Sequence, residues 1–139
     1  MSSMNFYTTI ASMRSPGTGL GTIYLFPWSI CIVFTLLILV LPVLTGATGI
    51  LVSDICFNTI YMDPAFGGDP VLYQHFFWVF GHPEVYILIV PAFGVLSHVL
   101  AGVAGSIIIY GYPSMVLAMG CISTLGSLVW GHHIYTVGL

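Results

Sequence analysis

Several residues that can do chemistry fall within otherwise apolar stretches of this sequence. One such stretch contains His82, Glu84 and Tyr86, and another ends in the pair His132 and His133. Ionisable groups within a membrane cost at least ~2 kcal/mol each, so they mark functional sites by default. Imidazole suits copper, zinc, iron or nickel, and a carboxyl at membrane depth is typical of an ion or proton path. These residue types therefore predict a transition-metal site with an adjacent proton route.

The spacing in the first stretch separates two directions on a helix. His82 and Tyr86 are four residues apart, so their side chains share a face about one turn apart. Glu84 points to nearly the opposite side. Ser97 follows Tyr86 by 11 residues, about three turns, and lies on the same stripe. We expect a route along this stripe toward Tyr86, and a separate route through Glu84.

The histidines also match in depth. His82 lies 25 residues before position 107, in the middle of an uncharged turn, and His132 lies 25 residues after it. In a helical hairpin such positions sit at one level, so His82, His132 and His133 can converge, near the outer side of the membrane. Neighbouring residues diverge by about 100° in an ideal α-helix. His132 and His133 can therefore share a metal only where the helix ends or unwinds.

Simpler roles compete with these. A membrane histidine is often an interhelical hydrogen-bond partner, and this reading suits His75 and His98 better than the three matched histidines. Glu84, if protonated, can merely bond a backbone carbonyl, and Pro83 can merely kink its helix.

The composition indicates what must position these residues. The chain has 139 residues, of which 58% are hydrophobic and 4% are charged, with a net charge of −3. A soluble domain carries about 25% charged residues, so a membrane protein of three or four helices is expected. The lack of a basic patch argues against nucleic-acid binding. The three cysteines form no close pair and suggest neither a disulfide framework nor a zinc site.

The fold class we predict is an all-α membrane protein with three transmembrane helices. Arg14, the only basic residue, places the N-terminus inside by the positive-inside rule. The expected segments are a polar N-terminal stretch (1–22), a first span (23–52), an acidic outer loop (53–70), a second span (71–104), an inner turn (105–111), a third span (112–133) and a C-terminal end (134–139).

Three motifs carry a family resemblance. They are FWVFGHPEVYIL at 77–88, VWGHHIYTVG at 129–138 and DPAFGGDPVLYQH at 63–75. Together they resemble subunit 1 of the haem–copper oxidases, to which mitochondrial cytochrome c oxidase belongs. The similarity covers about residues 5–139 and corresponds to the fifth to seventh helices of the family's twelve-helix bundle.

The resemblance assigns roles to the residues singled out above. It implies that His82, His132 and His133 ligate the copper called CuB, which faces the oxygen-binding haem. Tyr86 matches the tyrosine that is covalently joined to the ring of His82 and that lends a proton and an electron to oxygen reduction. Glu84 matches the proton-relaying glutamate at the end of one uptake path.

The second proton path is implied only in part by this chain. Ser97 matches a residue that delivers protons to Tyr86, with His98 beside the entrance. The lysine typical of that path belongs to another helix, and this chain has no lysine. The iron ligands of both haem a groups also belong to other helices. We therefore interpret the chain as one piece of a split subunit, or an excerpt of a longer one.

The implied function is part of the catalytic subunit of a proton-pumping terminal oxidase in the mitochondrial inner membrane, which reduces O2 to water with electrons from cytochrome c. Expected partners are the remaining fragments of subunit 1, subunits 2 and 3 and other subunits, cytochrome c through subunit 2, and the lipid bilayer. A partner or lipid should cover the apolar turn at 106–110. The alternatives are a quinol oxidase, less plausibly a nitric oxide reductase, and a structural three-helix subunit without metal.

Overall fold

The computed structural model describes residues 1–138, and all regular secondary structure in that range is helical. The elements in chain order are α1 (Ser2–Ser12), α2 (Leu25–Cys56), the 3-10 helix η1 (Pro64–Phe66), α3 (Pro70–Val103), α4 (Tyr112–Gly126) and the 3-10 helix η2 (Trp130–Val137). Three stretches are long and apolar enough to cross a membrane: Leu25–Cys56, Pro70–Val103 and Tyr112–Val137. The predicted fold class, an all-α protein with three membrane helices, is confirmed.

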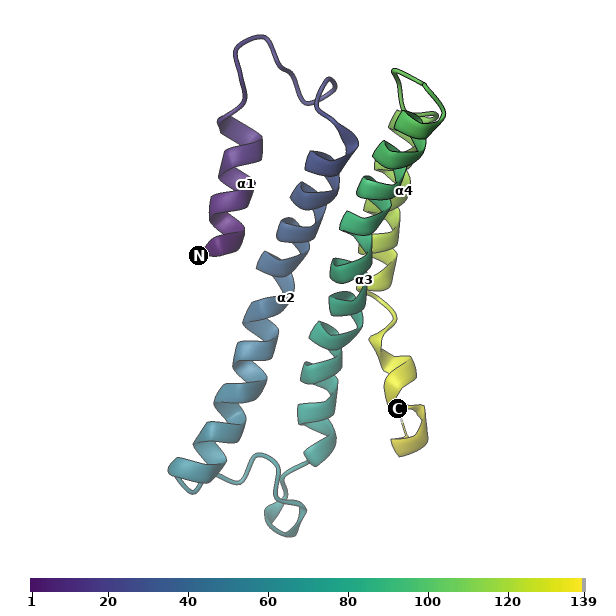
Figure 1. Cartoon of the computed structure of the whole chain (residues 1–139). Coiled ribbons are helices and arrows are strands. Elements are labelled where there is room, and N and C mark those ends of the chain that lie inside the picture. The colour runs from purple at the N-terminus through teal and green to yellow at the C-terminus, as the bar shows by residue number, and fades with distance from the viewer. Residues whose placement is uncertain (139) are drawn as a thin grey trace.

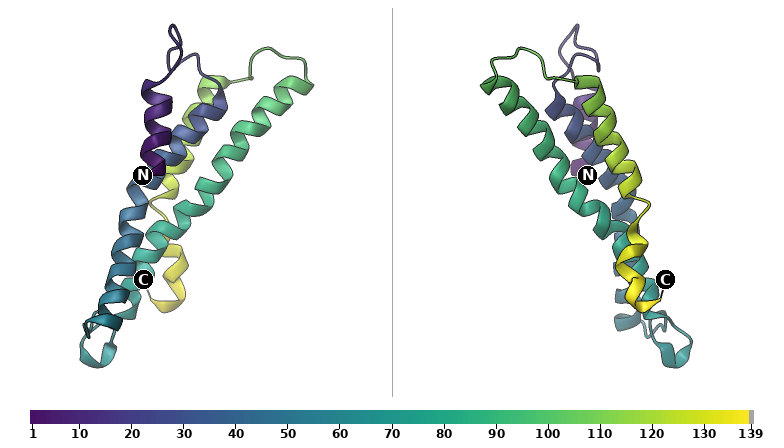
Figure 2. Two further views of the ribbon diagram at one scale, coloured as in Figure 1. Left: turned by 60° about the vertical axis from the view of Figure 1, so that its left-hand side comes forward. Right: turned by 90° about the vertical axis from the view of Figure 1, so that its right-hand side faces the viewer.

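The long helices form a narrow bundle that opens at one end. α2 and α3 run antiparallel and are joined by the loop that contains η1, and α4 returns beside them (Figure 1). Figure 2 shows that α3 is inclined to α2 and α4 and that its C-terminal end lies apart from the beginning of α4, so the turn after α3 joins two separated helix ends. At the closed end, η2 lies against α3. The chemistry-bearing residues of α3 and η2 are therefore brought together near the loop between α2 and α3.

Aspartate and proline together fix where two helices begin. The side chain of Asp69 accepts a hydrogen bond from the backbone N–H of Val71, and Pro70 is the first residue of α3. Asp63 and Pro64 do the same for η1. An aspartate cap satisfies a free N–H of the first turn, and proline is tolerated there because its missing N–H has no helical partner. The Asp69-Pro70 pair therefore fixes the residue at which α3, the helix that contains His82, begins.

The helix ends differ from the expected segments in three places. Within the polar stretch 1–22, Ser2–Ser12 forms α1, which lies along α2 through the stacked rings of Phe6 and Phe34, 4.4 Å apart. α2 continues to Cys56, so it includes the first residues of the expected outer loop. The α-helical part of the third span ends at Gly126, and both of its histidines lie in η2.

The core between α2, α3 and α4 is small. Its buried apolar residues are Leu25, Val33, Leu36, Val40, Ile87, Val90 and Met119. α2 and α3 approach closely at Gly94, where an added Cβ would lie 2.8 Å from Ser29 Oγ and 3.1 Å from Phe26 Cα. Small residues that let helix backbones approach are typical of packing within membranes. Most other apolar side chains point outward, including Leu88, which is 69% exposed, as expected of surfaces that meet lipid or further helices.

Candidate metal centre

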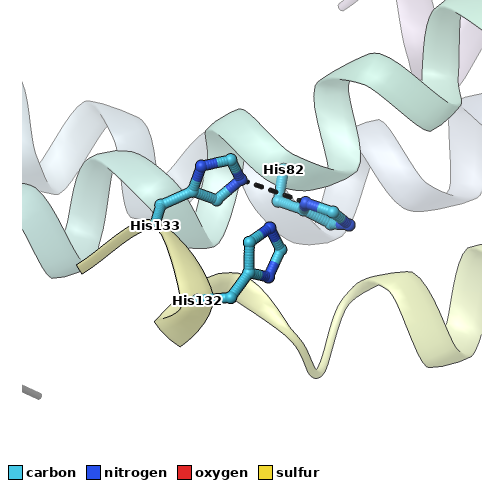
Figure 3. A group of neighbouring side chains, drawn as sticks. All are labelled: His82, His132 and His133. Atoms are coloured by element: carbon cyan, nitrogen blue, oxygen red, sulfur yellow. Dashed lines mark hydrogen bonds between the residues drawn. The ribbon is translucent and has the colours of Figure 1, made fainter. Parts of the chain in front are cut away.

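Three histidines meet where η2 lies against α3. The ligand nitrogens of His82, His132 and His133 all lie within 4.8 Å of one another. Figure 3 shows the ring of His82 coming from α3 and the other two from η2. His82 Nδ1 and His133 Nε2 are 3.2 Å apart, and the rings of His132 and His133 have centroids 4.1 Å apart. The structure thus brings together the set that depth matching selected.

The arrangement fits a metal ion. Imidazole nitrogens bind a first-row ion at about 2.0–2.1 Å, so two of them on one ion at an angle between 90° and 110° lie roughly 2.9–3.4 Å apart. The 3.2 Å between His82 Nδ1 and His133 Nε2 falls in that range. His82 is buried, and its Nε2 has no hydrogen-bond partner among the described residues. A buried imidazole that contacts two more imidazoles and has one ring nitrogen of its own without a partner suits a metal site better than a purely structural cluster.

The non-α conformation of η2 allows the adjacent histidines to share this space. Two ring contacts accompany it. Trp78 stacks on His133, with centroids 3.8 Å apart and planes 4° from parallel, and His82 meets His132 edge-on with centroids 4.7 Å apart. The backbone N–H of His132 bonds the carbonyl of Val129, and His132 Nδ1 contacts that same oxygen. The chain has left the α-helical conformation at His132 and His133, as expected.

Tyr86 lies one turn further along α3. Its ring centroid is 4.7 Å from that of His82, with the planes at 65°. The ring also packs on Gly126, where an added Cβ would lie 2.7 Å from Tyr86 Cδ2 and Cε2. The Tyr86 ring therefore contacts both His82, as the four-residue spacing predicts, and the last residue of α4.

The remaining candidates do not join this cluster. Glu84 is half-buried on α3, and its carboxyl makes no hydrogen bond within residues 1–138. Ser97 is half-buried and lines a pocket beside the turn after α3. His98 Nε2 accepts a hydrogen bond from the backbone N–H of Phe26 at 3.0 Å, and its ring lies against Tyr24. His98 thus caps the first turn of α2, an interhelical role of the kind considered above.

The whole chain is similar to known proteins of one family. The profile of a family described as cytochrome c and quinol oxidase polypeptide I matches residues 1–139. The chain belongs to this family. It is 57% identical to cytochrome c oxidase subunit 1 of Plasmodium berghei and of Plasmodium falciparum, over 100% of the chain and 29% of each relative. It is 50% identical to cytochrome c oxidase subunit 1 of Cereibacter sphaeroides, over 100% of the chain and 24% of the relative.

The chain therefore spans 24–29% of the length of these oxidase subunits. The predicted membership of the haem–copper oxidases is confirmed, and so is the prediction that the similarity is to a segment of subunit 1. The three membrane-crossing helices agree with a membrane location for an oxidase polypeptide.

Three neighbours of the candidate metal centre and of Tyr86 become visible in the structure. Trp78 covers His133, Gly126 receives the Tyr86 ring, and Trp130 Nε1 donates a hydrogen bond to His75 Nδ1 at 3.3 Å. Spacing offers a signal for Trp78, because it precedes His82 by four residues and so shares its face. No sequence signal identifies the other two, because each depends on how η2 or α4 is rotated against α3.

Proposed function

We propose that this chain is part of the catalytic subunit of a cytochrome c oxidase, in which His82, His132 and His133 hold the copper CuB. The observation that supports the proposal best is the convergence of their nitrogens within 4.8 Å in a chain of this family. The bound copper and an oxygen-binding haem supply the site at which O2 is reduced to water. Both haem a groups would take their iron ligands from helices outside residues 1–139, and these residues would contribute contacts only.

The chain's own residues would serve proton and electron delivery. The Tyr86 phenol, whose ring lies beside His82, gives up a proton and an electron to oxygen reduction, and the two rings are close enough to be cross-linked. Glu84 relays protons by a separate route, because it projects from a different side of α3. Ser97, with His98 beside it, lies on the approach to Tyr86 from the open end of the bundle. The direction of transport and the coupling to pumping belong to the complete oxidase.

The chain would lie in the mitochondrial inner membrane. The chain would assemble with the rest of subunit 1, subunits 2 and 3 and further subunits, and would receive electrons from cytochrome c through subunit 2. The outward-facing apolar side chains support packing against such helices or lipid. Ile107, Ile108 and Tyr110 in the turn after α3 are strongly exposed, which supports cover of this turn in the complex.

Copper content tests the proposal directly. His132→Ala in the assembled complex should abolish binding of this copper and oxygen reduction, because two histidines remain where three ligands are needed. The His132 side chain is exposed, so its truncation leaves no cavity in the core. His98→Ala is the matched control, since it removes a histidine of α3 outside the cluster and should retain copper. Elemental analysis per mole of complex gives the answer, and normal copper with normal oxygen consumption in His132→Ala would favour the structural three-helix alternative.

The electron donor is a second point to test. The family includes both cytochrome c and quinol oxidases, whereas the relatives named above are cytochrome c oxidases. Oxygen consumption by the intact complex with reduced cytochrome c should exceed that with a quinol. The opposite preference would assign the chain to a quinol oxidase without affecting the copper proposal.

A further inference from the structure

η2 carries two of the three candidate ligands but has little backbone support. α4 ends at Gly126, and a turn at 127–129 separates it from η2, so the α-helical hydrogen bonds of α4 do not continue into Trp130–Val137. A 3-10 helix has poorer hydrogen-bond geometry than an α-helix, and runs of this length are uncommon. Side-chain contacts with α3 must therefore determine how η2 is rotated about its own axis.

One polar contact joins the beginning of η2 to α3. Trp130 Nε1–H donates to His75 Nδ1 at 3.3 Å, and both side chains are part-buried. Because Nδ1 accepts, the proton of the neutral His75 ring is on Nε2. Trp130 makes this bond from the first residue of η2, at the point where the segment leaves the turn.

The periodicities of the two helices connect this bond to the histidine cluster. In a 3-10 helix the side chains of residues i and i+3 are eclipsed, so Trp130 and His133 lie on one side of η2. On α3, His75, Trp78 and His82 are spaced by three and four residues and form one stripe. The contacts follow in matching order: His75 with Trp130, Trp78 with His133, and His82 with His133. A rotation that broke the first contact would swing His133 away from His82.

We propose that His75 is a positioning residue for the metal centre, whose hydrogen bond to Trp130 holds η2 at the rotation that brings His133 and His132 to His82. This inference rests on the proposed copper function. His75 acts through Trp130, and it is not itself a ligand, since it lies outside the group of three and its Nδ1 is already engaged.

The test measures copper retention in the assembled oxidase. His75→Phe fills a similar volume but cannot accept the hydrogen bond, and Trp130→Phe keeps an aromatic ring but cannot donate it. Each should lose copper to a chelator about 10-fold faster than the wild type, at the lower end of the roughly 10- to 100-fold loss of affinity typical of groups that orient ligands. His75→Gln offers an amide oxygen to the indole N–H and should recover most of the retention.

Two comparisons separate positioning from general damage. His75→Phe combined with Trp130→Phe should release copper no faster than either single variant, because both remove the same bond. Gln74→Leu changes the polar neighbour of His75 on another side of α3 and should release copper at the wild-type rate. Additive effects of the two single variants, or no rescue by glutamine, would overturn the role of the hydrogen bond.

The outcome also separates this inference from the copper function. If the wild type holds the copper, His132→Ala loses it, and His75→Phe and Trp130→Phe release it at the wild-type rate, the positioning role is wrong and the ligand assignment stands. If the wild type and His132→Ala contain the same copper, the ligand assignment itself is wrong.

Discussion

Replacing Gly126 by alanine should displace Tyr86 without touching a candidate ligand. Gly126 ends α4, and the Tyr86 ring occupies the space that a side chain at this position would need. An added Cβ would be 2.7 Å from both Cδ2 and Cε2 of that ring. Carbon atoms in favourable contact are about 3.5–4.0 Å apart, so ring and helix must separate by about 1 Å. The Tyr86 ring is rigid and also contacts His82, so we expect a shift of the ring to change its position relative to His82.

The expected effect is larger on catalysis than on folding. Overpacking of this kind costs about 1–3 kcal/mol of stability. A displacement of about 1 Å at a reacting group can cost on the order of 100-fold in rate. Since the ring centroids of Tyr86 and His82 are 4.7 Å apart in the structure, the shift should also lower the yield of their proposed cross-link. Copper should remain, because all three histidines are unchanged.

Three measurements on the assembled oxidase check this prediction: oxygen consumption, copper content, and mass spectrometry of the peptide containing His82 and Tyr86. Gly120→Ala is the matched control, since it lies on the same helix and its Cβ would meet nothing within 4 Å. The reasoning is refuted if Gly126→Ala and Gly120→Ala have equal turnover and equal cross-link yield. Loss of copper in Gly126→Ala would also contradict it, by showing that the contact supports the ligands.

Two further predictions concern the packing of α2 on α3. His98→Leu removes the acceptor for the Phe26 N–H and should lower the stability of the complex by about 1 kcal/mol. His98→Gln offers another acceptor and should retain most of the wild-type stability. Equal thermal stability of the two variants would show that the cap is unimportant. Gly94→Ala should lower the free energy of unfolding of the complex by about 1–3 kcal/mol, seen as a lower melting temperature, because its Cβ would meet Ser29 Oγ at 2.8 Å. Gly102→Ala, in open space on the same helix, should be neutral or stabilising, and a similar loss for both variants would exclude the close contact as the cause.

Most of the helical framework follows from local properties of the sequence. Asp69 and Pro70 specify the start of α3 through a cap and a fixed φ, and apolar runs with few charges specify which segments cross a membrane. From that start, regular rise and rotation place His82 and Tyr86 on one face. The same rule places the histidine pair at the level of His82, because an uncharged turn lies midway between them.

The sequence by itself thus determined the family, the three spanning helices and the membership of the histidine cluster. Tertiary structure alone decided that α4 stops at Gly126, that η2 takes its rotation from His75 and Trp78, and that His98 caps α2. The physical reason is that helical periodicity is a property of one segment. The rotation of one helix against another depends on which side chains fit between them, and a glycine or an indole N–H reveals its partner only after the segments have packed.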